Sequence, residues 1–139
     1  MGTVSETITE NIFRDYYRLD GFIEKSAIPK HFGFKSKKGT SNKGFPDFFK
    51  DLDDYAIVVE AKATEHSKGE AEVQFYMVNN NIDKDIIGIA ISGQEISQIK
   101  VTYFYKLKGT DEVIQFKVKD CLLSLDSLHK KFQRHKNGE

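Results

Sequence analysis

Residues 55–63 constrain the fold of this 139-residue chain more than any other stretch. Their β-branched apolar run, residues 57–59, favours a β-strand. Side chains alternate between the two faces of a strand, so Glu60 and Lys62 are expected on the same face. The segment therefore predicts an apolar strand that ends with a carboxylate and an ammonium side by side.

A second short apolar run, residues 45–49, precedes this strand and contains the pair Pro46-Asp47. The turn-prone residues 51–54 join the two runs, which predicts a β-hairpin. Antiparallel pairing of the runs would bring the side chain of Asp47 close to that of Glu60. Two carboxylates and a lysine at one sheet edge are the groups that a divalent-metal phosphodiesterase needs.

The pattern Pro46-Asp47, a twelve-residue gap and Glu60-Ala61-Lys62 resembles the PD-(D/E)xK nuclease superfamily, which includes restriction endonucleases and archaeal Holliday-junction resolvases. This resemblance implies an α/β fold with a restriction-endonuclease-like αβββαβ core, in which helices flank a mixed central sheet. It also implies that Asp47, Glu60 and the backbone carbonyl of Ala61 bind a metal ion. Lys62 would then orient the attacking water or stabilise charge on the phosphate. Oxygen ligands of this kind favour Mg²⁺ or Mn²⁺ over zinc.

The N-terminal segment predicts an amphipathic helix that begins near Ser5 or Thr7 and is capped by Gly21. Apolar residues at helical spacing define its expected buried face: Ile8, Ile12, Tyr16 and Leu19. Glu10, with Gly21 eleven residues later, is similar to the opening of archaeal resolvases, whose first helix carries a metal-site glutamate. The resemblance makes Glu10 the candidate ligand, with Glu6 second. A role for this glutamate in a capping box and an ion pair stays open.

Residues 70–80 predict a helix directly after the strand that carries Glu60 and Lys62. One side of this helix is expected to carry Ala71, Gln74, Phe75 and Val78. The resemblance implies that Gln74 reaches toward the site and orients Lys62 or a phosphate. The alternative is that Gln74 is an ordinary helix residue, since helices tolerate glutamine at any position.

A lysine-rich stretch precedes the hairpin, with six lysines and no acidic residue in residues 25–43. By resemblance, its loop would contact the backbone of double-stranded DNA through Lys35, Lys37, Lys38 and Lys43. The alternative is a solvated loop without a partner. Between the first helix and this loop, residues 22–34 predict an edge strand or an irregular extended segment, because Pro29 disfavours both a helix interior and a central strand.

The second half of the chain predicts three more strands and a final helix. Residues 85–92 form a continuous apolar run, which is typical of a central strand that runs parallel to residues 55–63. Residues 99–107 and 113–118 predict a further hairpin, and residues 122–132 predict the closing helix. The expected organisation is a single domain over residues 1–128, followed by a basic tail or the start of a linker over residues 129–139.

Composition excludes several other classes of protein. The formal net charge is zero, so bulk charge does not indicate nucleic-acid binding. Cys121 is the only cysteine, which excludes a disulfide framework and a thiolate metal site, and its apolar neighbours predict that it is buried. No signal peptide or long apolar span is found, so a cytoplasmic protein without a membrane partner is expected. Four histidines share no ligand spacing and are expected at the surface: His31, His66, His129 and His135.

These expectations converge on a Mg²⁺-dependent deoxyribonuclease that hydrolyses phosphodiester bonds as an endonuclease. Residues 87–93, together with residues 101–107, resemble the N-terminal nuclease domain of restriction-modification proteins that carry an adenine methyltransferase or a translocase. Whether the chain is one module of such a longer protein stays open, as does its oligomeric state. Two alternatives remain: a Holliday-junction resolvase, which requires a dimer, and a catalytically silent nuclease-like module that binds DNA or a protein partner.

Overall fold

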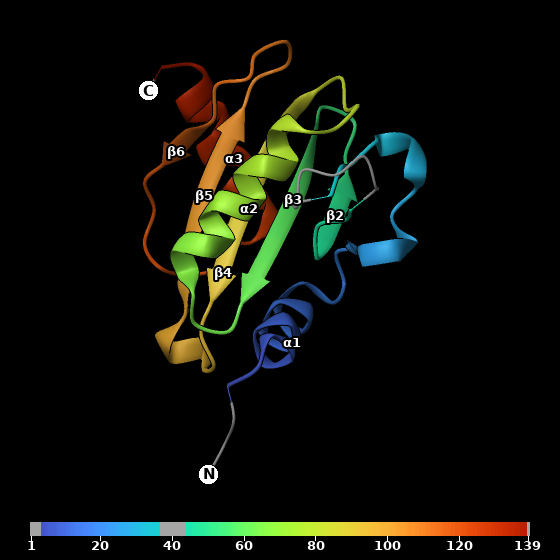
Figure 1. Cartoon of the computed structure of the whole chain (residues 1–139). Helices are drawn as coiled ribbons and strands as arrows, with labels where there is room; N and C mark the ends of the chain where they lie inside the picture. Colours follow the sequence, from blue (N-terminus) through green and yellow to red (C-terminus); the bar gives the residue numbers. More distant parts are fainter. Residues whose placement is uncertain (1–3, 37–43, 139) are drawn as a thin grey trace.

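One mixed six-stranded sheet forms the centre of the structure, a computed structural model that describes residues 4–36 and 44–138 (Figure 1). The strands are β1 (Ile23–Glu24), β2 (Phe48–Asp51), β3 (Tyr55–Lys62), β4 (Asp85–Ser92), β5 (Lys100–Lys106) and β6 (Ile114–Phe116). Their order in the sheet follows their order in the chain. Only β3 and β4 pair in parallel, and the other neighbours are antiparallel. The α/β class predicted from the sequence is confirmed.

The two central strands are β3 and β4, and every residue in both is buried. The predicted hairpin of β2 and β3 is present, with Phe48 opposite Val59. The helix α2 (His66–Val78) links β3 to β4, so the predicted parallel crossover is also confirmed. These strands agree with the sequence because continuous β-branched and apolar runs fit a sheet covered on both faces.

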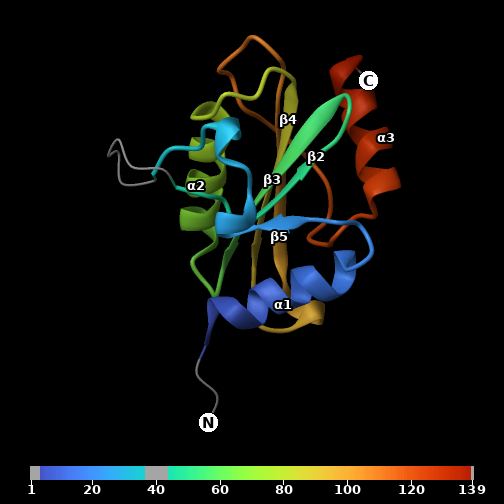
Figure 2. The same cartoon turned by 90° about the vertical axis from the view of Figure 1, so that its right-hand side faces the viewer.

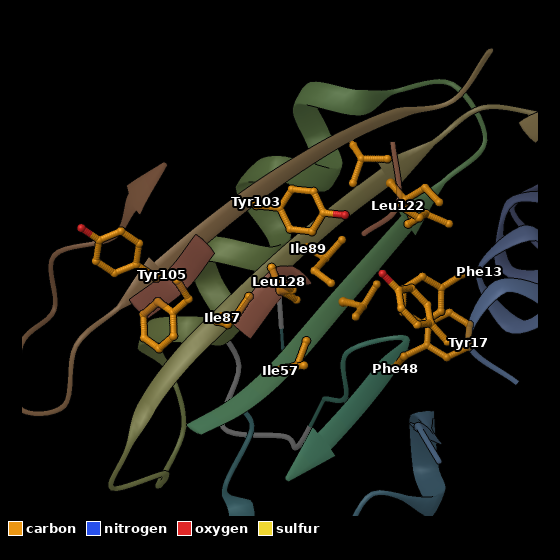
Figure 3. Packing of buried hydrophobic residues seen from close by; sticks show 14 of the residues in the cluster. Phe13, Tyr17, Phe48, Ile57, Ile87, Ile89, Tyr103, Tyr105, Leu122 and Leu128 are labelled. Carbon is orange, nitrogen blue, oxygen red and sulfur yellow. The ribbon is translucent and has the colours of Figure 1, made fainter. Parts of the chain in front are cut away.

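Two layers of helix cover the sheet (Figure 2). The helix α2 packs on one face, whereas α3 (Leu125–Lys136) lies on the opposite face and α1 (Glu6–Tyr17) crosses one end of the sheet. The larger core joins α1 and α3 to the sheet and includes Phe13, Ile57 and Leu128 (Figure 3). Ala56 and Val58 belong to the core under α2. By strand alternation, the side chains of Glu60 and Lys62 also lie on the α2 face.

The first helix buries a different face from the predicted one. Ser5 caps it by accepting a hydrogen bond from Thr7 N–H, and the helix ends at Tyr17, before Gly21. Its buried residues are Thr9, Glu10, Phe13 and Tyr17. Among the residues expected inside, Ile8, Tyr16 and Leu19 are exposed, and Ile12 only partly packs on the core. The aromatic pair determines this rotation, because Phe13 stacks on Phe48 at a centroid distance of 4.5 Å and Tyr17 packs beside it.

The second helix also differs in phase from the prediction. It begins at His66, and its buried residues are Gly69, Val73, Tyr76 and Met77, whereas Ala71 and Val78 are exposed. Glycine on the facing strand accounts for part of this packing, since a Cβ at Gly88 would clash with the Met77 sulfur. The exposed Val78 and the half-buried Gln74 therefore do not form the buried side.

The C-terminal segment belongs to the folded domain, which corrects the expected boundary at residue 128. The helix α3 continues to Lys136, and Phe132 is buried in the core. His129 stacks on the Tyr55 ring at 5.7 Å, and Lys136 Nζ lies 2.5 Å from Asp85 Oδ2. Cys121 is exposed and not buried as expected. Across residues 4–36 and 44–138, no helix has both the length and the apolar character needed to cross a membrane.

Candidate active site

Asp47 and Glu60 lie next to each other across the β2–β3 hairpin. The Asp47 N–H donates to Glu60 Oε2 at 2.9 Å, and the Ala61 N–H donates to Asp47 Oδ2 at 2.8 Å. The hairpin extends one residue beyond β2, because Asp47 N–H also donates to the Val59 carbonyl at 3.0 Å. The predicted proximity of the two carboxylates is confirmed, and two backbone-to-carboxylate hydrogen bonds hold it in place.

A third carboxylate, that of Glu10, completes an acidic cluster with Asp47 and Glu60. Glu60 is fully buried, Glu10 is buried on α1, and Asp47 is half-buried. Burial raises the pKa of the Asp47 carboxyl above its ordinary value, and the negative charge of Glu10 adds to this rise. Hydrogen bonds that the Asp47 carboxylate makes with the Ala61 N–H and with the Glu60 side chain, together with the charge of Lys25, oppose this rise. Burial and the charge of Glu10 therefore disfavour the ionised form of Asp47, and a nearby positive charge would stabilise it.

Lys62 lies on the same face of β3 as Glu60, with a side chain that is only 10% exposed. Its Nζ is 2.7 Å from Glu72 Oε2 on α2 and 3.3 Å from Glu6 Oε1 on α1. Glu72 was not identified from the sequence, because its approach to Lys62 depends on the phase of α2. Gly69 allows the close packing, since a Cβ there would lie 3.1 Å from Lys62 Cγ.

The first helix contributes Glu10 and Glu6 to different ends of the site. Glu10 pairs with Arg14 at 3.2 Å, so the ion pair inferred as an alternative role is present. Its other oxygen lies 3.0 Å from Lys25 Nζ, and its charge acts on Asp47. Glu6 contacts Lys62 instead. The geometry therefore brings Glu10, the first-choice glutamate, to the acidic cluster.

Two residues near the acidic cluster, Lys25 and Tyr76, were not identified from the sequence. Lys25 pairs with Glu10, and its pKa is raised by that hydrogen bond. Tyr76 on α2 is buried, and its pKa is raised by burial and then by the charges of Glu60, Asp47 and Glu72. A helix phase that places Tyr76 inward would have identified it, but the apolar pattern of α2 favoured the opposite side.

Gln74 is not at the site. Its side-chain amide donates to the backbone carbonyl of Glu70 at 3.1 Å, one turn earlier on α2. This is its only polar contact in the part of the chain that the structure describes. Two residues along a helix correspond to more than half a turn, so Gln74 faces away from the side that carries Glu72 and Tyr76. Gln74 therefore makes no contact with Lys62 within residues 4–36 and 44–138, whereas the expected contact of Gln74 with a phosphate stays a prediction.

The remaining expectations concern the lysines and the histidines. Lys37, Lys38 and Lys43 lie outside the described residues, whereas Lys35 is described and exposed. His66 is not a surface residue, which corrects the prediction. Its Nδ1 lies 2.8 Å from Ser92 Oγ and its Nε2 lies 2.8 Å from Thr102 Oγ1. Burial lowers the pKa of His66.

The chemistry of the donor atoms fits a hard divalent cation. Asp47 and Glu60 offer carboxylate oxygens, and the Ala61 carbonyl points to the same side of β3 as the N–H that binds Asp47. Within residues 4–36 and 44–138, no group of three or more histidine, cysteine or acidic side chains is arranged to hold a metal. Mg²⁺ needs only one or two carboxylates, because water completes its coordination. The residues present therefore suit Mg²⁺ or Mn²⁺ and not zinc.

Comparison of the chain with protein-family models, with curated proteins and with solved structures finds no match in any of the three.

Proposed function

We propose that this chain is a metal-dependent DNA endonuclease domain of the PD-(D/E)xK type. The observation that carries the proposal is the pair of hydrogen bonds that join Asp47 to Glu60 and to Ala61. The order of elements from α1 to β4 is α, three β, α, β, which is the order that the resemblance implies and which supports the proposal. The substrate is double-stranded DNA, and the reaction is hydrolysis of a phosphodiester bond in the cytoplasm.

Each residue of the site has a distinct role in this proposal. Asp47 and Glu60 hold Mg²⁺ or Mn²⁺ with the Ala61 carbonyl, while Glu10 assists directly or through water. When bound, the ion supplies Lewis-acid stabilisation of the phosphate and a more acidic water. Lys62 orients the attacking water or stabilises developing negative charge on the phosphate oxygens.

The finer proposal is that the domain is the cleavage module of a restriction-modification enzyme. It rests on the resemblance of residues 87–93 and 101–107, which overlap most of β4 and β5. In that setting, Lys35 and its neighbours in the lysine-rich stretch contact the DNA backbone. Sequence-independent phosphate contacts of this kind position a nuclease without specifying its target.

A catalytically silent DNA-binding module is the second candidate, and one observation favours it. The ammonium of Lys62 is already paired with Glu72 and Glu6, so it is not free to meet a phosphate unless one pair opens. A silent module would retain the acidic cluster as a structural element. Phosphate contacts by lysines would then account for DNA binding without hydrolysis.

Nicking of supercoiled plasmid in Mg²⁺ or Mn²⁺ separates the two candidates. The parent should cut, and Asp47→Ala should not, while the control Asp83→Ala should cut like the parent. Asp83 suits the control because its side chain is 86% exposed and its ion pair, with Lys108 at 3.6 Å, lies on the surface. A parent that binds DNA but never cuts it would identify the silent module. Faster cutting of a four-way junction than of a duplex would favour the resolvase.

A further inference from the structure

Lys25 places a positive charge directly against the acidic cluster. Its Nζ lies 3.0 Å from one carboxylate oxygen of Glu10 and 3.3 Å from the other. Its charge also acts on Asp47. The Lys25 ammonium therefore neutralises the same carboxylates to which the proposed function assigns a divalent cation.

The backbone of Lys25 is held in a conformation that side-chain-bearing residues avoid. Lys25 has φ +45°, and it is the only non-glycine residue with a positive φ among residues 4–36 and 44–138. The Lys25 N–H donates to the Asp47 carbonyl at 3.3 Å, and the Lys25 carbonyl accepts from Ile28 N–H at 3.0 Å. Strained backbone of this kind persists only when its surroundings over-determine it, and it concentrates at functional sites.

The Lys25 ammonium is held against Glu10, and it is also able to move away into solvent. The Lys25 side chain is 52% exposed, whereas Lys62, at the other end of the site, is 10% exposed. A long side chain that is half in solvent can rotate away without opening the core. Glu10 would keep Arg14 as a partner, at 3.2 Å, when Lys25 leaves.

We propose that Lys25 is the resident counter-cation of the acidic cluster, and that a divalent metal ion binds by displacing its ammonium. This inference rests on the proposed function, because it needs Asp47 and Glu60 to be metal ligands. Without metal, Lys25 keeps the acidic cluster partly neutralised. With metal, the same lysine opposes the ion by occupying space and by charge repulsion, so it sets the concentration of metal at which the site fills.

The test is calorimetric titration of Mn²⁺ into the folded chain without DNA. Lys25→Met removes the ammonium and keeps the length of the side chain, and we expect it to bind Mn²⁺ about tenfold more tightly than the parent. Lys25→Gly removes the ammonium and also relieves the strain at positive φ, so it should show the same gain in Mn²⁺ affinity. It replaces Lys25→Met in the test if the methionine variant folds poorly. Lys25→Arg keeps the positive charge and should bind Mn²⁺ no more tightly than the parent.

Lys68→Met is the matched control. Lys68 is a lysine of similar exposure, 61%, whose glutamate partner Glu65 lies 3.9 Å away and outside the acidic cluster. Its removal lowers the net charge by the same amount, so a general charge effect would appear in both variants. We expect Mn²⁺ affinity to stay at the parent value in Lys68→Met.

A second readout is the thermal shift that Mn²⁺ causes, which grows with affinity for the folded state. Lys25→Met should melt lower than the parent without metal and gain more on addition of Mn²⁺. Equal Mn²⁺ affinity in the parent, Lys25→Met and Lys25→Gly would overturn the displacement and leave the proposed metal site standing. Equal gains in Lys25→Met and Lys68→Met would also overturn it. No binding by any variant would instead overturn the metal site itself.

Discussion

The ammonium of Lys62 on β3 lies 2.7 Å from the Glu72 carboxylate on α2, in a position that is nearly closed to solvent. Glu6 on α1 is the second acidic partner, at 3.3 Å. This relationship ties the two helices to the strand that carries the proposed site. It also means that Lys62 must exchange one of these carboxylates for a phosphate or a water molecule if it takes part in catalysis.

The contribution of Glu72 to stability is measurable by substitution. Glu72→Ala should lower the free energy of unfolding by about 1–3 kcal/mol, because the nearly buried Lys62 ammonium then loses the acidic partner that lies 2.7 Å away. Urea denaturation gives the value, and Asp83→Ala, which breaks an exposed pair, should change it by less than about 0.5 kcal/mol. An unchanged midpoint for Glu72→Ala would show that the ion pair contributes nothing.

Two substitutions at Asp47 separate the effect of its charge from the effect of its hydrogen bond with Ala61 N–H. Asp47→Asn keeps an oxygen that can accept from Ala61 N–H and removes one negative charge from the acidic cluster, so stability without metal should hold or rise. Asp47→Ala leaves that N–H without its partner and should be less stable than Asp47→Asn by about 1–3 kcal/mol. Both variants should lose Mn²⁺-dependent cleavage. Full cleavage by Asp47→Asn would contradict a role as metal ligand.

Lys62 distinguishes an active nuclease from a nuclease-like binder. In Lys62→Ala the carboxylates remain, so Mn²⁺ binding should persist, whereas cleavage should fall by orders of magnitude because the missing charge acts mainly on the transition state. Lys62→Arg should not restore cleavage, since a planar guanidinium does not replace a compact ammonium. Plasmid nicking at matched metal and salt, with calorimetry alongside, measures both effects. Equal nicking by parent and Lys62→Ala would remove Lys62 from the mechanism.

The lysine-rich stretch is tested by the salt dependence of DNA binding. Replacing Lys37, Lys38 and Lys43 together by glutamine should weaken binding to every DNA sequence tested. The slope of log affinity against log salt should become shallower by about one for each DNA phosphate that the variant no longer neutralises. Fluorescence anisotropy over a salt series provides the slopes. A variant with the parent slope would return these lysines to the role of a solvated loop.

Protonation of His66 should lower the stability of the protein in mild acid. Its folded-state pKa is lowered, mainly by burial and to a smaller extent by the charge of Lys100, while Glu70 opposes the shift. The stability that neutral His66 provides is complete above the unfolded pKa of about 6.5 and is lost as pH falls through the lower folded pKa. The parent should therefore lose more unfolding free energy than His66→Gln as pH falls from about 7.5, above the unfolded pKa, into the acid range below it. Parallel losses in the two proteins would contradict this assignment.

Most of the sheet could be predicted from the sequence because its determinants are local. The acidic turn between β2 and β3 fixes the hairpin, and the alternation along β3 places Glu60 and Lys62 on one face. Register then brings Asp47 beside Glu60 without any information from the rest of the molecule. The central strand β4 was predictable for a similar reason, since a run of apolar residues has few alternatives to a buried strand.

The helices show where local pattern was insufficient. On α1, aliphatic residues at helical spacing suggested one buried face, but Phe13 and Tyr17 pack inward because Phe48 and its neighbours provide a surface for aromatic rings. On α2, room at Gly88 admits Met77, and the helix turns so that Tyr76 faces the acidic cluster. A helix with apolar residues on two sides has no preferred phase until a partner surface selects one.

The sequence by itself determined the α/β class, the hairpin and the pairing of Asp47 with Glu60, because adjacent residues and one short turn specify them. Only the tertiary structure decided that Glu72 and Glu6 hold Lys62, that Lys25 lies against Glu10, and that Gln74 faces away from the site. These interactions join elements that are far apart in the chain or depend on the rotation of a helix. Side-chain size and available space set that rotation, and both become defined only when the core is packed.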